Sequence, residues 1–280
     1  MSILYSRILK SNSPIIMGIL NVTPDSFSDG GKYLNSELAF NHLEKMIEEG
    51  AEIIDIGGES TRPGAGFVTE EEELLRVIPV IKEIKKKYNK IFISVDTTKS
   101  KVAEEAIKFG ADLINDISGG VFDNKIIEIA AESKTPIVVM HIKGNPKTMQ
   151  DNPLYNDVTS EVIAYLKERL KVIKKCGVTE IIIDPGIGFG KTVENNFSLL
   201  KNLDKFKNLE KPILIGVSKK SFLGKTLNLE IDQRANSTII TETIAALKGA
   251  KIIRTHNVKN AVELKTIYQH LNKPIISEHV

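Results

Sequence analysis

The sequence predicts an α/β protein with a (β/α)8 TIM barrel fold, organised as a single domain over residues 1–280. Eight short runs rich in β-branched residues alternate with longer amphipathic segments along the chain. The runs are apolar almost throughout, as strands of a parallel sheet are when both faces are covered. Eight strand–helix units in 280 residues match the usual size of such a barrel, which is about 250 residues.

An open, doubly wound sheet is the alternative architecture. Such a sheet usually has fewer strands and carries a glycine-rich nucleotide fingerprint, which this sequence lacks. The chain also contains no linker, internal repeat or low-complexity tract. These observations favour one closed barrel.

In chain order, the predicted strands occupy residues 15–20, 52–57, 91–96, 113–118, 136–141, 180–184, 212–218 and 251–256. The clearest helix between them repeats apolar residues every three or four positions, at Val158, Val162, Leu166, Leu170 and Ile173. Ile240, Ile244 and Leu247 repeat this spacing and predict a second amphipathic helix.

Two kinds of signal mark the helix ends. Thr69, followed by Glu72, predicts a capping box, with Glu70 and Glu71 in the positively polarised first turn. Glycines close several helical patterns shortly before a strand, where a left-handed cap is expected: Gly50, Gly110, Gly177 and Gly249.

The charge balance excludes some classes of protein. The chain has 38 basic and 36 acidic residues, a net charge of +2, which argues against a general nucleic-acid or membrane-surface binder. No apolar run is long enough to span a bilayer, and residues 1–14 lack the apolar segment of a secretion signal. We therefore expect a soluble, cytoplasmic protein.

Cys176 is the only cysteine in the sequence. It cannot form an internal disulfide, and a thiolate metal cluster is excluded. Its place at the end of a helical pattern, just before Gly177, predicts a packed and unreactive thiol.

Polar residues gather at the ends of the predicted strands. In a barrel these carboxyl ends meet at one mouth, where the chemistry is located. The residues in question are Asn21, Asp55, Asp96, Asn115, Asp116, His141, Asp184, Ser218, Lys219, Lys220, Arg254 and His256. An Asp at a strand end commonly caps the following helix, and Asp55 and Asp116 fit that role. The mixture of acids and bases predicts a ligand that has both hydrogen-bond donors and negative charge.

Arg254 and His256 lie two residues apart on one strand and so point to the same side. With Asn21 and the lysines across the mouth, they form a candidate site for phosphate or pyrophosphate. The alternative is a pair that merely solvates a strand end. Other strand ends, Asp96, Asn115 and Asp184, match the amide and amine edge of a heterocycle.

Residues 181–192, IIIDPGIGFGKT, resemble a nucleotide-binding loop at first sight. A phosphate cradle requires Gly-x-x-x-x-Gly-Lys-Ser/Thr, but Pro185 stands where the first glycine belongs and has no N–H to donate. The loop must therefore serve another purpose, and Lys191 and Thr192 are predicted to start the next helix.

Two loops are longer than the short connections expected in such barrels. The first follows strand one and reads NVTPDSFSDGGKYL; the second follows strand two and reads GGESTRPGAGFV. Loops of this length suit lids that close over a substrate and exclude water. The alternative is solvated loops with no role.

Together these segments resemble the dihydropteroate synthase family. The resemblance rests on MGILNVTPDSFSDGG, DIGGESTRPG, SVDTT, INDISG, HIKGNPKTMQ, DPGIGFGKT, SKKSFLG and RTHNV, in the family's order from residue 17 to 258. It implies a (β/α)8 barrel enzyme of folate biosynthesis that is usually a homodimer. Such an enzyme joins 4-aminobenzoate to 6-hydroxymethyl-7,8-dihydropterin pyrophosphate and forms 7,8-dihydropteroate and pyrophosphate.

The resemblance also implies roles for individual residues. The pterin is expected deep in the barrel, against Asp96, Asn115, Asp184 and Lys220. Its pyrophosphate is expected to meet Asn21, Arg254 and His256, with the cofactor Mg2+ held partly by Asn21 and further by Asp29. 4-Aminobenzoate is expected between the loops, near Phe27, Thr61, Pro63, Phe189, Lys220 and Ser221. The sequence departs from the common family pattern at Lys219, where many relatives have Arg, and at Ile142, where Met is frequent.

Breaking the C–O bond leaves negative charge on pyrophosphate and positive charge on the pterin methylene, so both ends need preorganised partners. Arg254, His256, Asn21 and Mg2+ are expected to hold the leaving group, while Asp96, helped by Asp184, favours the cation. The aromatic amine then attacks, so neither His141 nor Cys176 needs to act covalently. Asp96, Lys220, Arg254 and His256 are thus the predicted catalytic residues.

Two other functions are compatible with a pterin-binding barrel. One is a corrinoid-linked methyltransferase, which has no pyrophosphate to hold and therefore no use for the pair Arg254 and His256. The other is a paralogue that binds pterins without turnover and acts as a scaffold.

Overall fold

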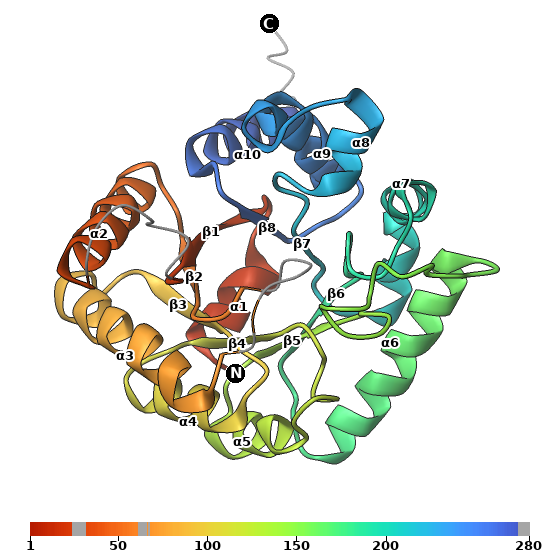
Figure 1. The fold of residues 1–280 in the computed structure, drawn as a ribbon. Helices are drawn as coiled ribbons and strands as arrows, with labels where there is room; N and C mark the ends of the chain where they lie inside the picture. Colours follow the sequence, from red (N-terminus) through yellow and green to blue (C-terminus); the bar gives the residue numbers. More distant parts are fainter. Residues whose placement is uncertain (24–31, 61–65, 67, 274–280) are drawn as a thin grey trace, which may run out of the picture.

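A computed structural model describes residues 1–23, 32–60, 66 and 68–273, with only the backbone described for 32–37. Eight parallel strands form one sheet in the order β6-β5-β4-β3-β2-β1-β8-β7. A parallel bridge between Ile183 and Ile213 joins the two outer strands of that order, so the sheet closes into a barrel with helices around it (Figure 1). The predicted (β/α)8 architecture is confirmed.

Each predicted strand is present. β1 runs one residue further than predicted, and the other seven are shorter than predicted. The strands are β1 (Ile15–Asn21), β2 (Ile53–Gly57), β3 (Phe92–Asp96), β4 (Leu113–Asp116), β5 (Ile137–Met140), β6 (Ile181–Asp184), β7 (Leu214–Ile215) and β8 (Ile252–Thr255). Because β7 is so short, Ser218, Lys219 and Lys220 lie in the loop that follows it.

The connecting segments are mostly helical. They are α1 (Ile3–Lys10), α2 (Lys32–Glu48), α3 (Glu70–Lys87), α4 (Ser100–Lys108), α5 (Lys125–Ser133), α6 (Val158–Lys175), α7 (Val193–Lys201), η2 (Leu203–Leu209), α8 (Ser221–Leu227), η3 (Ile231–Arg234), α9 (Ala235–Leu247) and α10 (Val258–Leu271). The four glycines predicted as helix caps all have positive φ angles, between 93° and 106°.

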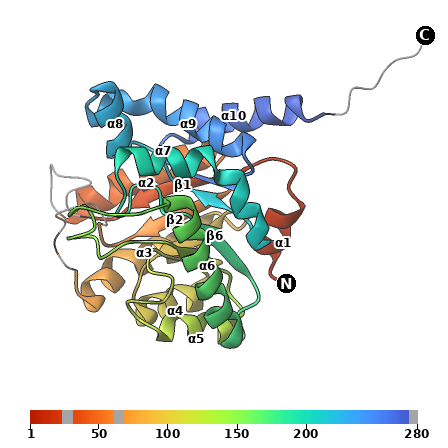
Figure 2. The ribbon, with the colours of Figure 1, turned by 90° about the vertical axis from the view of Figure 1, so that its right-hand side faces the viewer.

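The N-terminal helix α1 closes one end of the barrel. Leu4, Tyr5 and Ile8 pack against the inward-facing residues at the amino ends of the strands. Tyr5 also donates a hydrogen bond to the carbonyl oxygen of Ile181, at 3.1 Å. Figure 2 shows α1 at the side opposite the loops that follow the strands. Ligands therefore have access from the carboxyl ends of the strands.

Alternation along the strands separates two apolar layers. Residues such as Met17, Ile53 and Leu113 face the barrel interior, whereas their neighbours Ile16, Ile54 and Ile114 pack against the surrounding helices. Every second residue of a strand consequently points into the barrel. This alternation decides which polar side chains reach the site.

Two expectations about local packing are corrected. The helix predicted around Ile240, Ile244 and Leu247 is present as α9, but these side chains are 60%, 43% and 58% exposed. The side of α9 that packs on the barrel instead carries small and polar residues, among them Thr241 and Ala245. Cys176 was predicted to be packed but is exposed, because it lies at the C-cap of α6.

The predicted capping box at α3 forms only in part. The Thr69 side chain accepts a hydrogen bond from the backbone N–H of Glu72 at 3.2 Å, as expected for an N-cap. The Glu72 carboxylate, however, pairs with Arg76 one turn later. The helix start was correctly predicted, whereas the reciprocal bond was not.

Candidate active site

The strand register lines up polar residues at the open end of the barrel. Asn21 pairs with Gly57, Gly57 with Asp96, and Asp96 with Asn115, so these residues form one row across β1 to β4. Each lies an even number of residues from the inward-facing residues of its own strand, so it is on the same face of the strand. The row therefore borders the interior just below the mouth.

Arg254 occupies the centre of the floor of the site. From β8, its Nε lies 2.5 Å from Asp55 Oδ2, and its Nη2 lies 2.7 Å from Asp96 Oδ2. Asn115 donates to the same Asp55 oxygen at 3.0 Å. The contacts join four strands around one guanidinium.

Asp55 does not cap a helix, which corrects the expectation. Strand β2 runs two residues beyond it, to Gly57, so the carboxylate points into the barrel and is fully buried. Asp116, one residue after the inward-facing Asn115, points the other way. It accepts hydrogen bonds from Ser118 N at 2.7 Å and Gly120 N at 2.6 Å, so it closes the turn after β4. The following helix α5 has Asn124 at its N-cap, so the predicted helix cap is wrong for Asp116 as well.

The charges on the floor are unbalanced towards the negative. Asp55, Asp96 and Asp184 interact with the cations Arg254 and Lys220, so full ionisation of these five groups leaves one negative charge in excess. Burial raises the pKa of Asp96 to about 7, although Arg254 opposes this shift, and also raises the pKa of Asp184. Burial lowers the pKa of Lys220 to about 8. The floor thus favours a guest that brings positive charge or hydrogen-bond donors.

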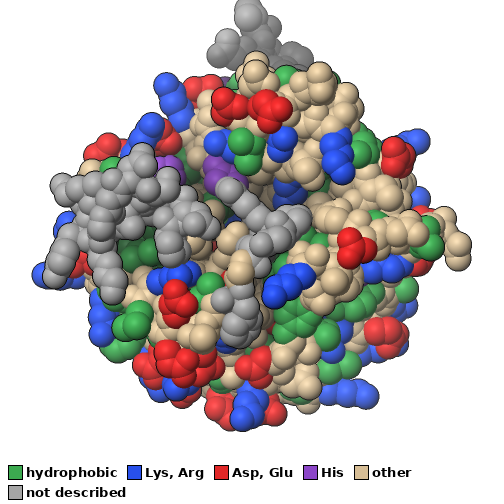
Figure 3. All heavy atoms as spheres, in the orientation of Figure 1, with side chains coloured by type: hydrophobic (Ala, Val, Ile, Leu, Met, Phe, Trp, Pro, Cys, Tyr) green, Lys and Arg blue, Asp and Glu red, His purple; other side chains and the backbone are tan. Residues whose placement is uncertain are grey.

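His256 follows β8 two residues after Arg254. Its backbone N–H donates to Ser218 Oγ at 3.1 Å, and its Nδ1 lies 3.0 Å from the same oxygen. Figure 3 views this end of the molecule and shows Lys, Arg and His side chains on it. The mouth is therefore suited to an anion above an acidic floor.

A cavity of about 450 Å3 adjoins this floor. Its walls come from the loops after four successive strands and include Glu59, Asp96, Lys99, Ile117 and Asn145. The volume is in the range typical of small-molecule sites, 300 to 1,000 Å3 by rough survey. Asp96 is the residue that connects the cavity with the ring of charges.

The loop after β6 is held in place through hydrogen bonds to its backbone carbonyl oxygens. Four successive carbonyl oxygens each accept a hydrogen bond from a different side chain: Ile187 from Lys220, Gly188 from Gln150, Phe189 from Lys191 and Gly190 from Tyr155. The N–H groups of Gly186 and Gly188 are taken by Asp184 and Asn196, at 2.7 and 2.6 Å. This arrangement confirms that the loop does not cradle a phosphate.

Two glycines of this loop are required by close packing. Gly186 and Gly190 have φ angles of 69° and 64°, in the left-handed region. A Cβ at Gly186 would collide with the carbonyl oxygen of His141, and a Cβ at Gly190 would lie 2.6 Å from that of Lys143. The loop therefore rests directly on the backbone that follows β5. Thr192 then caps α7 by accepting from Asn195 N at 3.2 Å. The predicted helix start is therefore correct at Thr192, whereas Lys191 lies in the loop before the helix.

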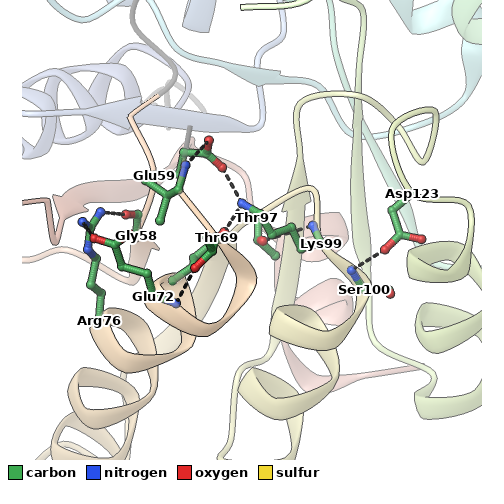
Figure 4. A network of polar contacts seen from close by, with 11 residues as sticks. Gly58, Glu59, Thr69, Glu72, Arg76, Thr97, Lys99, Ser100 and Asp123 are labelled. Atoms are coloured by element: carbon green, nitrogen blue, oxygen red, sulfur yellow. Dashed lines mark hydrogen bonds and ion pairs between the residues drawn. The ribbon is translucent and has the colours of Figure 1, made fainter. Parts of the chain in front are cut away.

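Figure 4 shows a charged network at the base of the second long loop. Lys99 Nζ lies 2.5 Å from Glu59 Oε2 and 2.5 Å from Glu73 Oε2, and Glu73 is fully buried. Glu59 also accepts from Val68 N at 3.3 Å, which ties the two ends of the loop together. Arg76 Nη1 donates to the Gly58 carbonyl oxygen at 2.7 Å. The ends of this loop are thus anchored to α3 and to the start of α4.

Comparison with known proteins agrees with this geometry. The family model described as pterin binding enzyme matches residues 17–256. Dihydropteroate synthase from Escherichia coli K12 is 46% identical over 263 residues, which cover 93% of this chain and 93% of that protein. The chain belongs to the dihydropteroate synthase family.

Solved structures of dihydropteroate synthases have the same fold. The Yersinia pestis enzyme with a sulfonamide drug complex superposes with a TM-score of 0.87 at 42% identity and covers 92% of this chain and 94% of its own. The Xanthomonas albilineans enzyme with 4-aminobenzoic acid gives a TM-score of 0.88 at 40% identity, covering 94% and 95%. Family membership and fold therefore agree over almost the whole chain.

The structure brings together most of the residues predicted for a dihydropteroate synthase site. Asp96, Asn115, Asp184, Lys220 and Arg254 surround the floor, with Asn21 and His256 at the mouth. Ser221 starts α8 and shares a cavity of about 260 Å3 with Gly188. The four residues Phe27, Asp29, Thr61 and Pro63 lie outside the described residues, so their roles remain predictions.

Sequence reasoning missed Asp55, Lys99 and Lys191 as site residues. Asp55 lies two residues from both Ile53 and Gly57, so it is on the same face of β2 as they are. This spacing could have identified it from the sequence. Lys99 and Lys191 lie in loops, where no periodicity shows that a lysine is buried. Within the described ranges, no group of three or more His, Cys, Asp and Glu could hold a metal ion, and no helix is long and apolar enough to cross a membrane.

Proposed function

We propose that this chain condenses 6-hydroxymethyl-7,8-dihydropterin pyrophosphate with 4-aminobenzoate, forming 7,8-dihydropteroate and releasing pyrophosphate. The observation that carries the proposal is the acidic floor beneath a basic mouth, centred on Arg254 between Asp55 and Asp96. A pterin offers N–H donors to carboxylates, and pyrophosphate offers anionic oxygens to Arg and His. The E. coli relative at 46% identity carries the name of this activity.

The pterin is assigned to the floor. Asp96, Asn115 and Asp184 offer acceptors and a donor for its amide and amine edge, and Lys220 interacts with both Asp184 and Asp96. Loss of pyrophosphate leaves positive charge on the pterin, and the excess negative charge of the floor stabilises that cation. The aromatic amine then attacks the methylene carbon, so no covalent bond to a side chain is needed.

The pyrophosphate is assigned to Asn21, Arg254 and His256. The amide oxygen of Asn21 is a hard donor of the kind that Mg2+ accepts, and Mg2+ commonly takes its remaining ligands from phosphate and water. We assign Asn21 and Asp29 to the metal, which when bound neutralises charge on the departing pyrophosphate. His256 is assigned to the pyrophosphate from the mouth and Arg254 from the floor beneath it, where it pairs with Asp55 and Asp96.

4-Aminobenzoate is assigned to the space beside Phe189, Lys220 and Ser221, with Phe27, Thr61 and Pro63 as further contacts. Lys220 Nζ lies 4.5 Å from the centroid of the Phe189 ring, so a cation and an aromatic face border this space together. The X. albilineans relative was solved with 4-aminobenzoic acid.

A turnover assay tests the proposed reaction. Purified protein with both substrates and Mg2+ is expected to release pyrophosphate and form a pteroate product, with both signals dependent on 4-aminobenzoate. A methyltransferase would show neither signal, and a non-catalytic paralogue would bind the pterin in calorimetry without releasing pyrophosphate.

We further propose that the protein is a homodimer in which the exposed apolar side of α9 faces a second copy. Ile240, Ile244 and Leu247 of α9 and Ile267 and Leu271 of α10 are exposed. Figure 2 shows α9 and α10 running along the same side of the barrel. A twofold axis lets one such self-complementary surface cover its copy.

Sedimentation of Ile244→Glu together with Leu247→Glu tests this interface. The variant is expected to sediment as a monomer, while the control Leu75→Glu, which changes an even more exposed apolar residue on α3, stays dimeric. A dimer that survives the α9 changes rejects this surface.

A cytoplasmic location is proposed as well, since the exposed, unpaired Cys176 suits a reducing compartment.

A further inference from the structure

Lys191 is buried where the loop after β6 meets β5. Only 3% of the residue is exposed, although it lies at the open end of the barrel. Three acceptors surround its Nζ: Nδ1 of His141 at 2.9 Å, the carbonyl oxygen of Phe189 at 2.9 Å and that of His141 at 3.4 Å. An ammonium group has three hydrogens to donate. The lysine therefore bonds two segments that are 50 residues apart in the chain.

The surroundings of this amine are unfavourable to charge. Burial lowers the pKa of His141 to about 3, so its imidazole is neutral. Nδ1 accepts from Lys191 in the tautomer that has its proton on Nε2. Burial also lowers the pKa of Lys191 well below its ordinary value. An apolar side chain would fill the same space without this desolvation cost. Stability alone thus does not account for a lysine here.

The orientation of the His141 ring is set by two tyrosines. Tyr165 meets it edge to face, with ring centroids 4.9 Å apart, and Tyr155 lies 6.2 Å away. The hydroxyl of Tyr155 donates to the carbonyl oxygen of Gly190 at 2.8 Å, next to the Phe189 carbonyl that Lys191 binds. The imidazole and the backbone of the loop are therefore fixed relative to each other.

Lys191 holds the backbone of Phe189 through the hydrogen bond to its carbonyl oxygen. One side of its ring packs on the apolar cluster of Ile117, Met140, Ile142 and Met149. The ring also borders Lys220. A shift of the Phe189 backbone would move the ring relative to both the floor and the lysine.

We propose that Lys191 and His141 form a positioning pair that fixes Phe189 as the wall against which 4-aminobenzoate packs, and so sets the affinity for the aromatic amine. The inference rests on the proposed function, which places that substrate beside Phe189. Neither residue touches the reacting atoms. The pair acts through the Phe189 backbone.

Kinetics of Lys191→Met test the pair, since Met matches the lysine side chain as far as Cε and removes the donor. The KM for 4-aminobenzoate is expected to rise about tenfold or more, as a misplaced binding group does. The KM for the pterin pyrophosphate should stay within about twofold, the usual limit for independent sites. Lys201→Met, an exposed lysine at the end of α7, is the matched control and should leave both constants unchanged.

Variants of His141 separate positioning from a general structural role. His141→Asn places an amide oxygen near the position of Nδ1 and should retain a nearly normal KM for 4-aminobenzoate, whereas His141→Leu should reproduce the effect of Lys191→Met. The double variant His141→Leu with Lys191→Met should be no worse than either single variant. Hydrogen exchange of residues 186–191 should increase in the variants that lack the bond and nowhere else.

The outcomes are distinguishable. Equal increases in both KM values, or unchanged exchange at residues 186–191, would overturn the positioning pair. If Lys191→Met fails to fold, the difference between His141→Asn and His141→Leu decides in its place. Phe189→Ala tests the underlying placement: no change in the KM for 4-aminobenzoate rejects that placement and the inference with it. Absence of turnover in the unaltered protein rejects the proposed function itself.

Discussion

The guanidinium of Arg254 lies between two carboxylates, with Nε 2.5 Å from Asp55 Oδ2 and Nη2 2.7 Å from Asp96 Oδ2. One cation thus serves a fully buried acid and a partly exposed one, and Asp184 is a third acid that interacts with the same guanidinium. This excess of negative charge beneath the mouth is the electrostatic basis of the proposed reaction.

Asp96→Asn removes the carboxylate assigned to the pterin cation. We expect turnover to fall on the order of 100- to 1000-fold, the usual effect of losing one transition-state partner, about 3 to 4 kcal/mol. The fold should persist, because the change also removes repulsion from Asp55. Pyrophosphate release and thermal unfolding measure the two effects, and full activity in this variant would refute the assignment.

The activity is expected to depend on pH through Asp96. Its pKa is raised by burial to about 7, so the carboxylate is largely protonated below that pH. The kcat/KM for the pterin substrate should therefore rise by about tenfold per pH unit below pH 7 and level off above it. Stability should change in the opposite sense: between about pH 4 and 7 the folded state binds more protons, so the free energy of unfolding decreases as pH rises.

Asp55→Asn provides the control for that pH dependence. The charge of Asp55 is one of the causes that raise the pKa of Asp96, so its removal should shift the midpoint of the activity profile to lower pH. Asn keeps an oxygen for the hydrogen bond from Asn115. An unchanged midpoint would show that a group other than Asp96 controls the profile.

Arg254→Ala is expected to weaken pyrophosphate binding by about 10- to 100-fold, as the loss of charged hydrogen bonds does. It also leaves Asp55 and Asp96 without their shared cation, which should repel the anion further. We expect the enhancement of binding by Mg2+ to be lost. Calorimetry with pyrophosphate, with and without Mg2+, measures both changes, and binding equal to that of the unaltered protein would remove Arg254 from the anion site.

Lys99→Met is expected to destabilise the fold by about 3 to 5 kcal/mol, the usual cost of leaving a buried charge unpaired. The charge concerned is Glu73, which is fully buried and lies 2.5 Å from Lys99. Urea unfolding measures the loss. Adding Glu73→Gln should recover most of it, and an equally unstable double variant would show that the pair is not the cause.

The sequence alone was sufficient for the barrel and for most of its polar floor. Strands buried on both faces must be apolar throughout, so runs such as 181–184 stand out from the helices around them. Once the barrel is inferred, the ends of its strands converge, and Asp96, Asn115 and Arg254 have to meet. Local composition and chain topology together decide this part of the molecule.

Only the tertiary structure shows which contacts the remaining side chains make. Asp55 was taken for a cap because a carboxylate near a strand end fits that role, although the predicted strand 52–57 already ran past it. Only the structure shows that its partners are Arg254 and Asn115. The apolar side of α9 faces outward. The sequence could not predict this, because a helical pattern shows that one side of a helix is apolar but not what covers that side. Lys191 is buried by a contact with His141 across 50 residues of chain, and no local pattern carries information about a contact of that range.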